Sequence, residues 1–251
     1  MNALSVIYAV LFYLATALLV FGLAWKMLGY ARTPAPLKIP TTPAPTTRSG
    51  VVFRMFQEVV FFASLFKSNK WTWLFGWLFH FGLLIVLLRH LRYFVAEPWF
   101  WIHWLQPFGK YASLAMVGGL AGLWFRRLAV DRVRYISSPS DHLMLLLLLM
   151  IGITGMLMTF FEKVDIIGLK AFFLGMLRFD LQPLPADILI VFHLSLVLIL
   201  MIIFPFSKLL HAPGVFFSPT LNQVDNPREQ RWLGGYAGAR RRVWSIKSSL
   251  K

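Results

Sequence analysis

Five long apolar runs constrain this chain more than any other feature of its sequence. They cover about residues 4–25, 71–95, 108–125, 143–161 and 187–211. A helix needs about 20 apolar residues to cross the roughly 30 Å hydrocarbon core of a bilayer. Each run approaches or exceeds that length, so we expect an all-α fold in which residues 1–211 form a bundle of five transmembrane helices.

The composition agrees with a membrane protein. Hydrophobic residues make up 58% of the chain and charged residues only 14%, whereas a soluble domain carries about 25% charged residues. The chain has no Cys, which excludes disulfides, thiolate metal sites, iron–sulfur clusters and covalently attached c-type haem. The net charge of +15 would suggest nucleic acid in a soluble protein. Here the basic residues lie between the apolar runs, so we expect membrane lipid and no nucleic acid as a partner.

The positions of these basic residues predict the orientation. With five spans, 19 of the 25 Lys and Arg residues lie on one side, in residues 26–70, 126–134 and 208–251. The positive-inside rule then places the N-terminus outside and the C-terminus in the cytoplasm, with residues 212–251 as a basic cytoplasmic tail. No Lys or Arg precedes the first run, so we interpret it as a retained span and not a signal peptide. We expect a multi-pass protein of the inner (cytoplasmic) membrane.

The segment between the first two runs has two parts. Residues 32–48 are rich in Pro and Thr and are typical of a solvated linker. Residues 51–67 mix charged residues with bulky apolar ones, which predicts a helix on the inner membrane surface. A docking element for a neighbouring subunit is the alternative.

Four histidines lie on the second and fifth runs. His80 and His90 are ten residues apart, and His193 and His211 are eighteen apart. Ionisable residues inside spans are functional hypotheses, and the two runs cross the membrane in opposite directions. We therefore expect one pair near each face, His80 with His211 inside and His90 with His193 outside. Two stacked imidazole pairs suit two bis-histidine b-type haems.

The helical geometry supports this pairing only in part. Eighteen residues make five turns, so His193 and His211 would point the same way on one helix. The two separations correspond to rises of about 15 Å and about 27 Å, and a tilt or a kink at Pro205 has to absorb the difference.

Other interpretations of the histidines remain open. All four could be core residues with satisfied hydrogen bonds, and the chain would then be a haem-free membrane anchor or scaffold. A zinc site is disfavoured, because the two histidines of the second run are too far apart. A transporter is disfavoured, because the runs show no repeat pair. For His103 and His142 we favour ordinary polar contacts, with Ser140 or Asp141 capping the helix that follows.

The histidine pattern resembles the nitrate reductase gamma subunit family of diheme membrane cytochromes b. The resemblance rests on the two histidine separations, on the run from Phe204 to His211, and on the basic stretch at residues 126–134. Residues 64–80 and 88–93 are similar to one branch in particular. That branch is the membrane cytochrome b subunit of the sulfite reduction-associated transmembrane complex.

This resemblance implies a redox subunit of a quinone-linked oxidoreductase complex, not an enzyme by itself. Such a subunit exchanges electrons between the quinone pool and a cytoplasmic iron–sulfur protein related to heterodisulfide reductase, in dissimilatory sulfur metabolism. The branch also implies a second membrane subunit, a periplasmic multihaem cytochrome c and a periplasmic ferredoxin-like protein. A gamma subunit of respiratory nitrate reductase is the alternative within the family, and the direction of electron flow stays open.

Four basic residues are candidates for further contacts. The family implies a quinone site near the outer haem, and Lys110 lies at the matching depth. Haem propionates need cationic or hydrogen-bonding partners, for which Arg89 and Arg92 flank the outer haem and Lys208 lies near the inner one. Snorkelling at the end of a span is the alternative role for all four.

Overall fold

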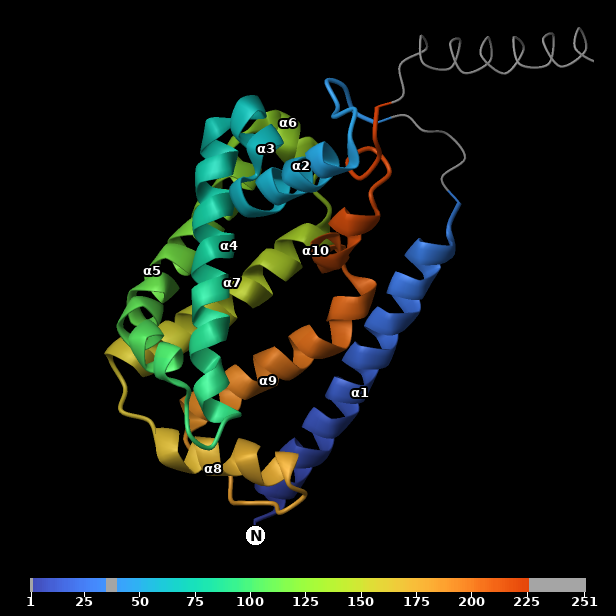
Figure 1. Cartoon of the computed structure of the whole chain (residues 1–251). Coiled ribbons are helices and arrows are strands. Elements are labelled where there is room, and N and C mark those ends of the chain that lie inside the picture. Colours follow the sequence, from blue (N-terminus) through green and yellow to red (C-terminus); the bar gives the residue numbers. More distant parts are fainter. Residues whose placement is uncertain (1, 35–39, 226–251) are drawn as a thin grey trace, which may run out of the picture. The chain divides into compact units, whose positions relative to one another are not determined.

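The computed structural model describes residues 2–34 and 40–225, and this part of the chain is helical without a strand. Its helices are α1 (Ala3–Arg32), α2 (Arg48–Phe61), α3 (Ala63–Ser68), α4 (Lys70–His90), α5 (Phe100–Ala129), α6 (Asp131–Ile136), α7 (Pro139–Phe160), α8 (Ile166–Leu177), α9 (Ile188–Ile203) and α10 (His211–Gly214) (Figure 1). The chain divides into two compact units. The first comprises the residues up to Lys26 and Phe62–Leu210, and the second comprises Met27–Phe61 and the residues from His211 onward.

Four helical segments are long and apolar enough to cross a membrane. They are Ala3–Arg32, Lys70–Tyr93, Pro139–Phe160 and Ile188–Phe206. Four of the five expected runs therefore form such helices. The remaining run lies within α5, which has 30 residues but is less apolar because it includes Lys110 and several glycines.

Helices α4 and α5 pack with their backbones in contact. A Cβ atom placed at Gly82 would lie 2.8 Å from the Ala112 carbonyl oxygen. One placed at Gly119 would lie 2.7 Å from the Phe75 carbonyl oxygen and from the Phe79 amide nitrogen. Later residues of α4 thus contact earlier residues of α5, so the two helices are antiparallel, as Figure 1 shows. Only glycine permits this approach, which is how small residues bring membrane helices together.

The remaining long helices continue this order. A Cβ atom at Gly152 of α7 would lie 2.9 Å from the side chains of Met116 and Val117 on α5. Helix α9 runs antiparallel to α7, since His193 contacts Thr154 and Lys208, just beyond α9, contacts Asp141. Helices α4, α5, α7 and α9 therefore alternate in direction.

Helix α1 runs parallel to α9. The Tyr8 hydroxyl lies 2.5 Å from the Ser195 hydroxyl, and a Cβ atom at Gly22 would lie 2.8 Å from the Pro205 ring. Two helices that cross a bilayer in the same direction must be separated by an odd number of other crossings. The parallel direction of α1 and α9 is therefore the one expected if α4, α5 and α7 each cross the membrane between them.

The short apolar helix α8 completes the main core. Its Phe172 is fully buried, and its Phe173 packs edge-on against Phe12 of α1, with ring centroids 5.4 Å apart. The Tyr13 hydroxyl donates to the Met176 carbonyl oxygen at 2.6 Å. Helix α8 therefore joins α1 and α9 in one hydrophobic cluster. The sequence analysis did not anticipate this helix, because its 12 residues are too few for a span.

The fifth run is not one continuous helix. Helix α9 ends at Ile203, and a 3₁₀ turn (Phe204–Phe206) follows. Pro205 lacks the N–H that would continue the α-helix, and Ser207 is extended before a second short turn begins. His193 and His211 therefore do not lie on one helix, and their relative directions do not follow from their separation.

In the second unit, the linker is paired with the segment that follows α10. The Thr41 N–H donates to the Thr220 carbonyl oxygen at 2.9 Å, and the Asp225 N–H donates to the Pro45 carbonyl oxygen at 2.8 Å. The helix expected over residues 51–67 is interrupted at Phe62. Its first part, α2, exposes a row of bulky apolar side chains, among them Val52, Phe53 and Phe56. From residue 226 on, the expected basic tail lies outside the described residues.

Replacement of Gly119 by Ala should destabilise the protein. The new methyl group would meet the α4 backbone, which cannot move aside as a side chain can, and overpacking of this kind costs about 1–3 kcal/mol. Gly118 is the matched control, because a Cβ atom there meets nothing within 4 Å. Thermal unfolding of purified protein in detergent measures the difference. Equal midpoints for G119A and G118A would contradict the backbone contact.

Candidate functional site

His90 and His193 lie at the same end of the helix bundle in the first unit. His90 is the last residue of α4 and His193 lies in the second turn of α9. Both side chains are partly buried, and Tyr93, just after His90, packs against the core cluster that includes Ile190 and Leu194. Two helices that are far apart in the sequence thus bring two imidazoles to one end of the bundle.

Backbone carbonyls fix two of the rings. His80 Nδ1 lies 2.7 Å from the Gly76 carbonyl oxygen, and His90 Nδ1 lies 2.6 Å from the Val86 carbonyl oxygen. A carbonyl oxygen can only accept, so Nδ1 must carry the proton in both rings. The lone pair then resides on Nε2, the nitrogen that can bind a metal. Metal-bound histidines characteristically donate their other N–H to such an acceptor.

A hydroxyl group performs the same task at His193. Its Nδ1 lies 2.8 Å from Thr154 Oγ1 of α7, and a Cβ atom at Gly155 would lie 3.5 Å from its Cε1. Thr154 was not predicted from the sequence as a site residue. A hydrogen-bonding side chain in the middle of an apolar run is the feature that could have indicated it.

A cationic cluster lies beside His90. Arg89 Nε and Arg92 Nη1 both donate to the Gln106 side-chain oxygen, at 3.2 and 2.9 Å. Arg92 Nη2 donates to the Tyr93 hydroxyl at 2.7 Å, and the Tyr93 ring lies 5.8 Å from the His90 ring. Within the described residues no carboxylate pairs with either arginine, and Arg92 Nε is buried without a partner. Two positive charges and an unused donor make this place suited to an anion such as a carboxylate.

Lys110 lies nearby along the sequence but makes a different contact. Its ammonium nitrogen is 4.9 Å from the centre of the Phe160 ring, at the end of α7. This is a cation–π contact, and it connects α5 to α7. A role for Lys110 at a quinone stays a prediction.

The surroundings of His80 differ from those of His90. The rings of Phe62 and Phe79 contact the His80 ring edge-on, at centroid distances of 5.0 and 4.6 Å. Phe62 has a φ of 50°, a conformation that is unusual and strained for a bulky residue. His211 begins α10, is exposed, and belongs to the second unit. The pairing of His80 with His211 stays a prediction.

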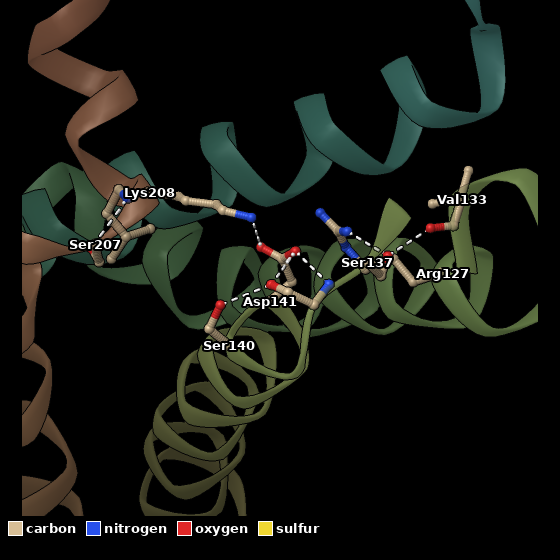
Figure 2. Close-up of polar contacts among 9 residues, drawn as sticks. Arg127, Val133, Ser137, Ser140, Asp141, Ser207 and Lys208 are labelled. Atoms are coloured by element: carbon tan, nitrogen blue, oxygen red, sulfur yellow. Dashed lines mark hydrogen bonds and ion pairs between the residues drawn. The ribbon is translucent and has the colours of Figure 1, made fainter. Parts of the chain in front are cut away.

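A polar cluster gathers where α7 begins (Figure 2). The buried Asp141 carboxylate accepts from the Ser138 N–H and hydroxyl, at 3.0 and 2.9 Å, and from Lys208 Nζ at 2.6 Å. Ser138 and Asp141 form a capping box, so the N-cap of α7 is Ser138 and not Ser140. Lys208, expected as a propionate partner, donates to Asp141.

The other two histidines have no comparable setting. His142 Nδ1 accepts from Trp124 Nε1 at 3.1 Å, which confirms the expected ordinary polar contact. His103 is exposed in the first turn of α5. Among the described residues, no three His, Asp or Glu side chains gather as a zinc site requires.

Replacement of Asp141 by Ala should lower the free energy of unfolding by about 0.5–2 kcal/mol, because it breaks the capping box in which the carboxylate accepts from the half-buried Ser138. Replacement of Lys208 by Met should cost only about 0–1 kcal/mol, since the Lys208 side chain is 75% exposed. Denaturant titration of both variants and of the double variant measures their coupling. If the two changes were simply additive, the ion pair would contribute nothing.

Comparison with known proteins identifies relatives of this chain. The family model for the nitrate reductase gamma subunit matches residues 61–225, which include all four candidate histidines. The Hdr-like menaquinol oxidoreductase cytochrome b-like subunit of Archaeoglobus fulgidus is 34% identical, over 91% of this chain and 82% of its own. The protein of the same name from Archaeoglobus profundus is 31% identical, over 92% and 82%. These relatives agree with the cytochrome b branch that the sequence resembles, and the chain belongs to the nitrate reductase gamma subunit family.

Proposed function

We propose that this chain is the diheme b electron-transfer subunit of a membrane-bound respiratory complex in dissimilatory sulfur metabolism. The observation that carries the proposal is the shared state of His80, His90 and His193. Each Nδ1 has a hydrogen-bond acceptor, which leaves Nε2 with the lone pair that binds iron. Packing histidines in a haem-free anchor would also need hydrogen-bond partners, but they could use either ring nitrogen.

The four histidines would hold two haems. His90 and His193 would hold the outer haem, and His80 and His211 would hold the inner one. Haem, when bound, supplies a one-electron redox centre, while the protein supplies its position and electrostatic surroundings. The position of His90 and His193 at the same end of the bundle supports the first pair.

The arginine cluster fits the propionates of the outer haem. Arg89 and Arg92 both donate to the Gln106 side-chain amide. Because this amide is uncharged, it does not neutralise their positive charges. The buried Arg92 Nε still has a hydrogen to donate. For the inner haem we keep Lys208 as the proposed partner, because its ammonium group is a cation that donates hydrogen bonds.

The proposed substrate is a quinol. The names of both relatives, menaquinol oxidoreductase subunits, support this choice. Oxidation of one quinol to the quinone releases two electrons and two protons. The two electrons reduce a cytoplasmic iron–sulfur partner related to heterodisulfide reductase, and the protons leave to solvent. We propose that the Lys110 ammonium donates a hydrogen bond to a quinone oxygen.

We also propose the complete five-span topology in the inner membrane, with the N-terminus outside and residues 212–251 in the cytoplasm. Contacts between α4 and α5 extend from Gly119 to the pair Arg89 and Gly109, so α5 reaches the same depth as α4. A second membrane subunit, a periplasmic multihaem cytochrome c and a ferredoxin-like protein are the further partners proposed. Co-purification of a molybdenum enzyme instead would identify a nitrate reductase gamma subunit.

The purified complex should show the reduced-minus-oxidised spectrum of b haem, with two haems per chain. His90→Ala and His193→Ala should each remove one haem and keep the other, because each removes one ligand of the same iron. His103→Ala is the control and should keep both. Quantitative haem extraction with optical spectra provides the measurement, and a wild-type chain without haem would favour the anchor.

Arg92→Gln should lower the midpoint potential of one haem and leave the other unchanged. A nearby positive charge favours the reduced state, which carries one positive charge less than the oxidised state, so its removal stabilises the oxidised state. Arg132→Gln removes an equal charge from an exposed position on α6 and should change neither potential. Redox titration followed at the haem absorption bands tests both variants. Identical titrations for R92Q and wild type would place the propionates elsewhere.

A further inference from the structure

Thr154 is a buried hydroxyl in the middle of a membrane-spanning helix. Its side chain belongs to α7, 15 residues after the start of that helix, and the residue is 3% exposed. It plays no part in capping a helix end. A hydroxyl at such a depth must find its partners within the protein, because lipid offers none.

The hydrogen bonds around this hydroxyl determine which atom donates to which. Thr154 Oγ1 lies 2.8 Å from the Met150 carbonyl oxygen and 3.1 Å from that of Ile151. Both carbonyls are pure acceptors, and a hydroxyl has one proton to donate. That proton therefore points to the α7 backbone. The hydroxyl oxygen is then the acceptor for His193 Nδ1–H at 2.8 Å.

This arrangement sets His193 apart from His80 and His90. Those two rings donate to carbonyls four residues earlier in their own helix, so each would keep its orientation if α4 were isolated. The acceptor for His193 comes from the neighbouring helix. The orientation of this ring therefore depends on the packing of α9 against α7, where the Thr154 hydroxyl faces Nδ1.

We infer that Thr154 is a positioning residue that fixes the tautomer and orientation of His193 and strengthens it as an axial ligand of the outer haem. This inference rests on the function proposed above. A hydroxyl already polarised by a backbone carbonyl accepts the Nδ1–H and makes Nε2 a stronger donor to iron. A stronger donor favours the oxidised state of the iron, and Thr154 thereby holds the midpoint potential of that haem down.

The chain offers a matched set of variants. Thr154→Val keeps the volume of the side chain and removes the hydroxyl, whereas Thr154→Ser keeps the hydroxyl. Thr154→Ala removes it without any risk of a clash. The control is Thr159→Val in the same helix, because the Thr159 hydroxyl donates only to the Gly155 carbonyl oxygen and contacts no histidine.

The experiment is a redox titration of both haems in the intact purified complex, combined with electron paramagnetic resonance of the oxidised form. T154V and T154A should shift one of the two midpoint potentials upward and change the resonance signal of the same haem. T154S and T159V should match the wild type in both readouts. Loss of one haem in T154V with both retained in T154S supports the same role, because Val preserves the packing.

Three results would overturn the inference. They are unchanged potentials and signals in T154V, an equal change in T159V, or a T154S variant that behaves like T154V. A merely structural role would lower the unfolding temperature without a selective effect on one haem. Absence of b haem from the wild-type complex is a separate outcome, because it contradicts the proposed function itself and removes the ligand that Thr154 is inferred to support.

Discussion

Hydrocarbon provides no hydrogen-bond partners, and this constraint governs the whole structure. Each polar group inside the bundle needs an acceptor or donor within the protein. Three histidines of the first unit, His80, His90 and His193, meet this demand through Nδ1, at carbonyls of α4 or at the Thr154 hydroxyl. The hydrogen bond that makes each imidazole tolerable among apolar side chains also leaves the lone pair on Nε2. The same bond therefore satisfies the membrane environment and the proposed haem ligation.

The same constraint explains why the helices approach so closely. Lipid tails are as apolar as Leu, so membrane helices associate through packing. At Gly82 and Gly119 the backbones of α4 and α5 touch, and the position of His90 at the end of α4 follows from this contact. On the other side of the bundle, the register of α9 against α7 positions His193. The candidate site thus depends on helix contacts that lie several turns away from it.

The sequence predicted the long helices well, because run length and apolarity are local properties. The sequence did not predict the features that depend on contacts between helices. Helix α8 is too short for a span and is recognisable only from its burial against α1 and α9. The end of α9 was placed too late, although Pro205 marked it. His90 and His193 became candidates from spacing and direction, whereas Thr154 and Gln106 did not, because their contacts depend on neighbours from other helices.

The contact between α1 and α9 has a consequence for the biogenesis of the protein. The Tyr8 hydroxyl reaches Ser195, which lies 187 residues further along the chain. At ribosomal rates of about 5–20 residues per second, roughly 10–40 s pass between the synthesis of the two. During this interval α1 resides in the bilayer without the helix that covers its polar face. An insertase or a membrane-embedded chaperone that binds newly inserted helices would stabilise α1 during this interval.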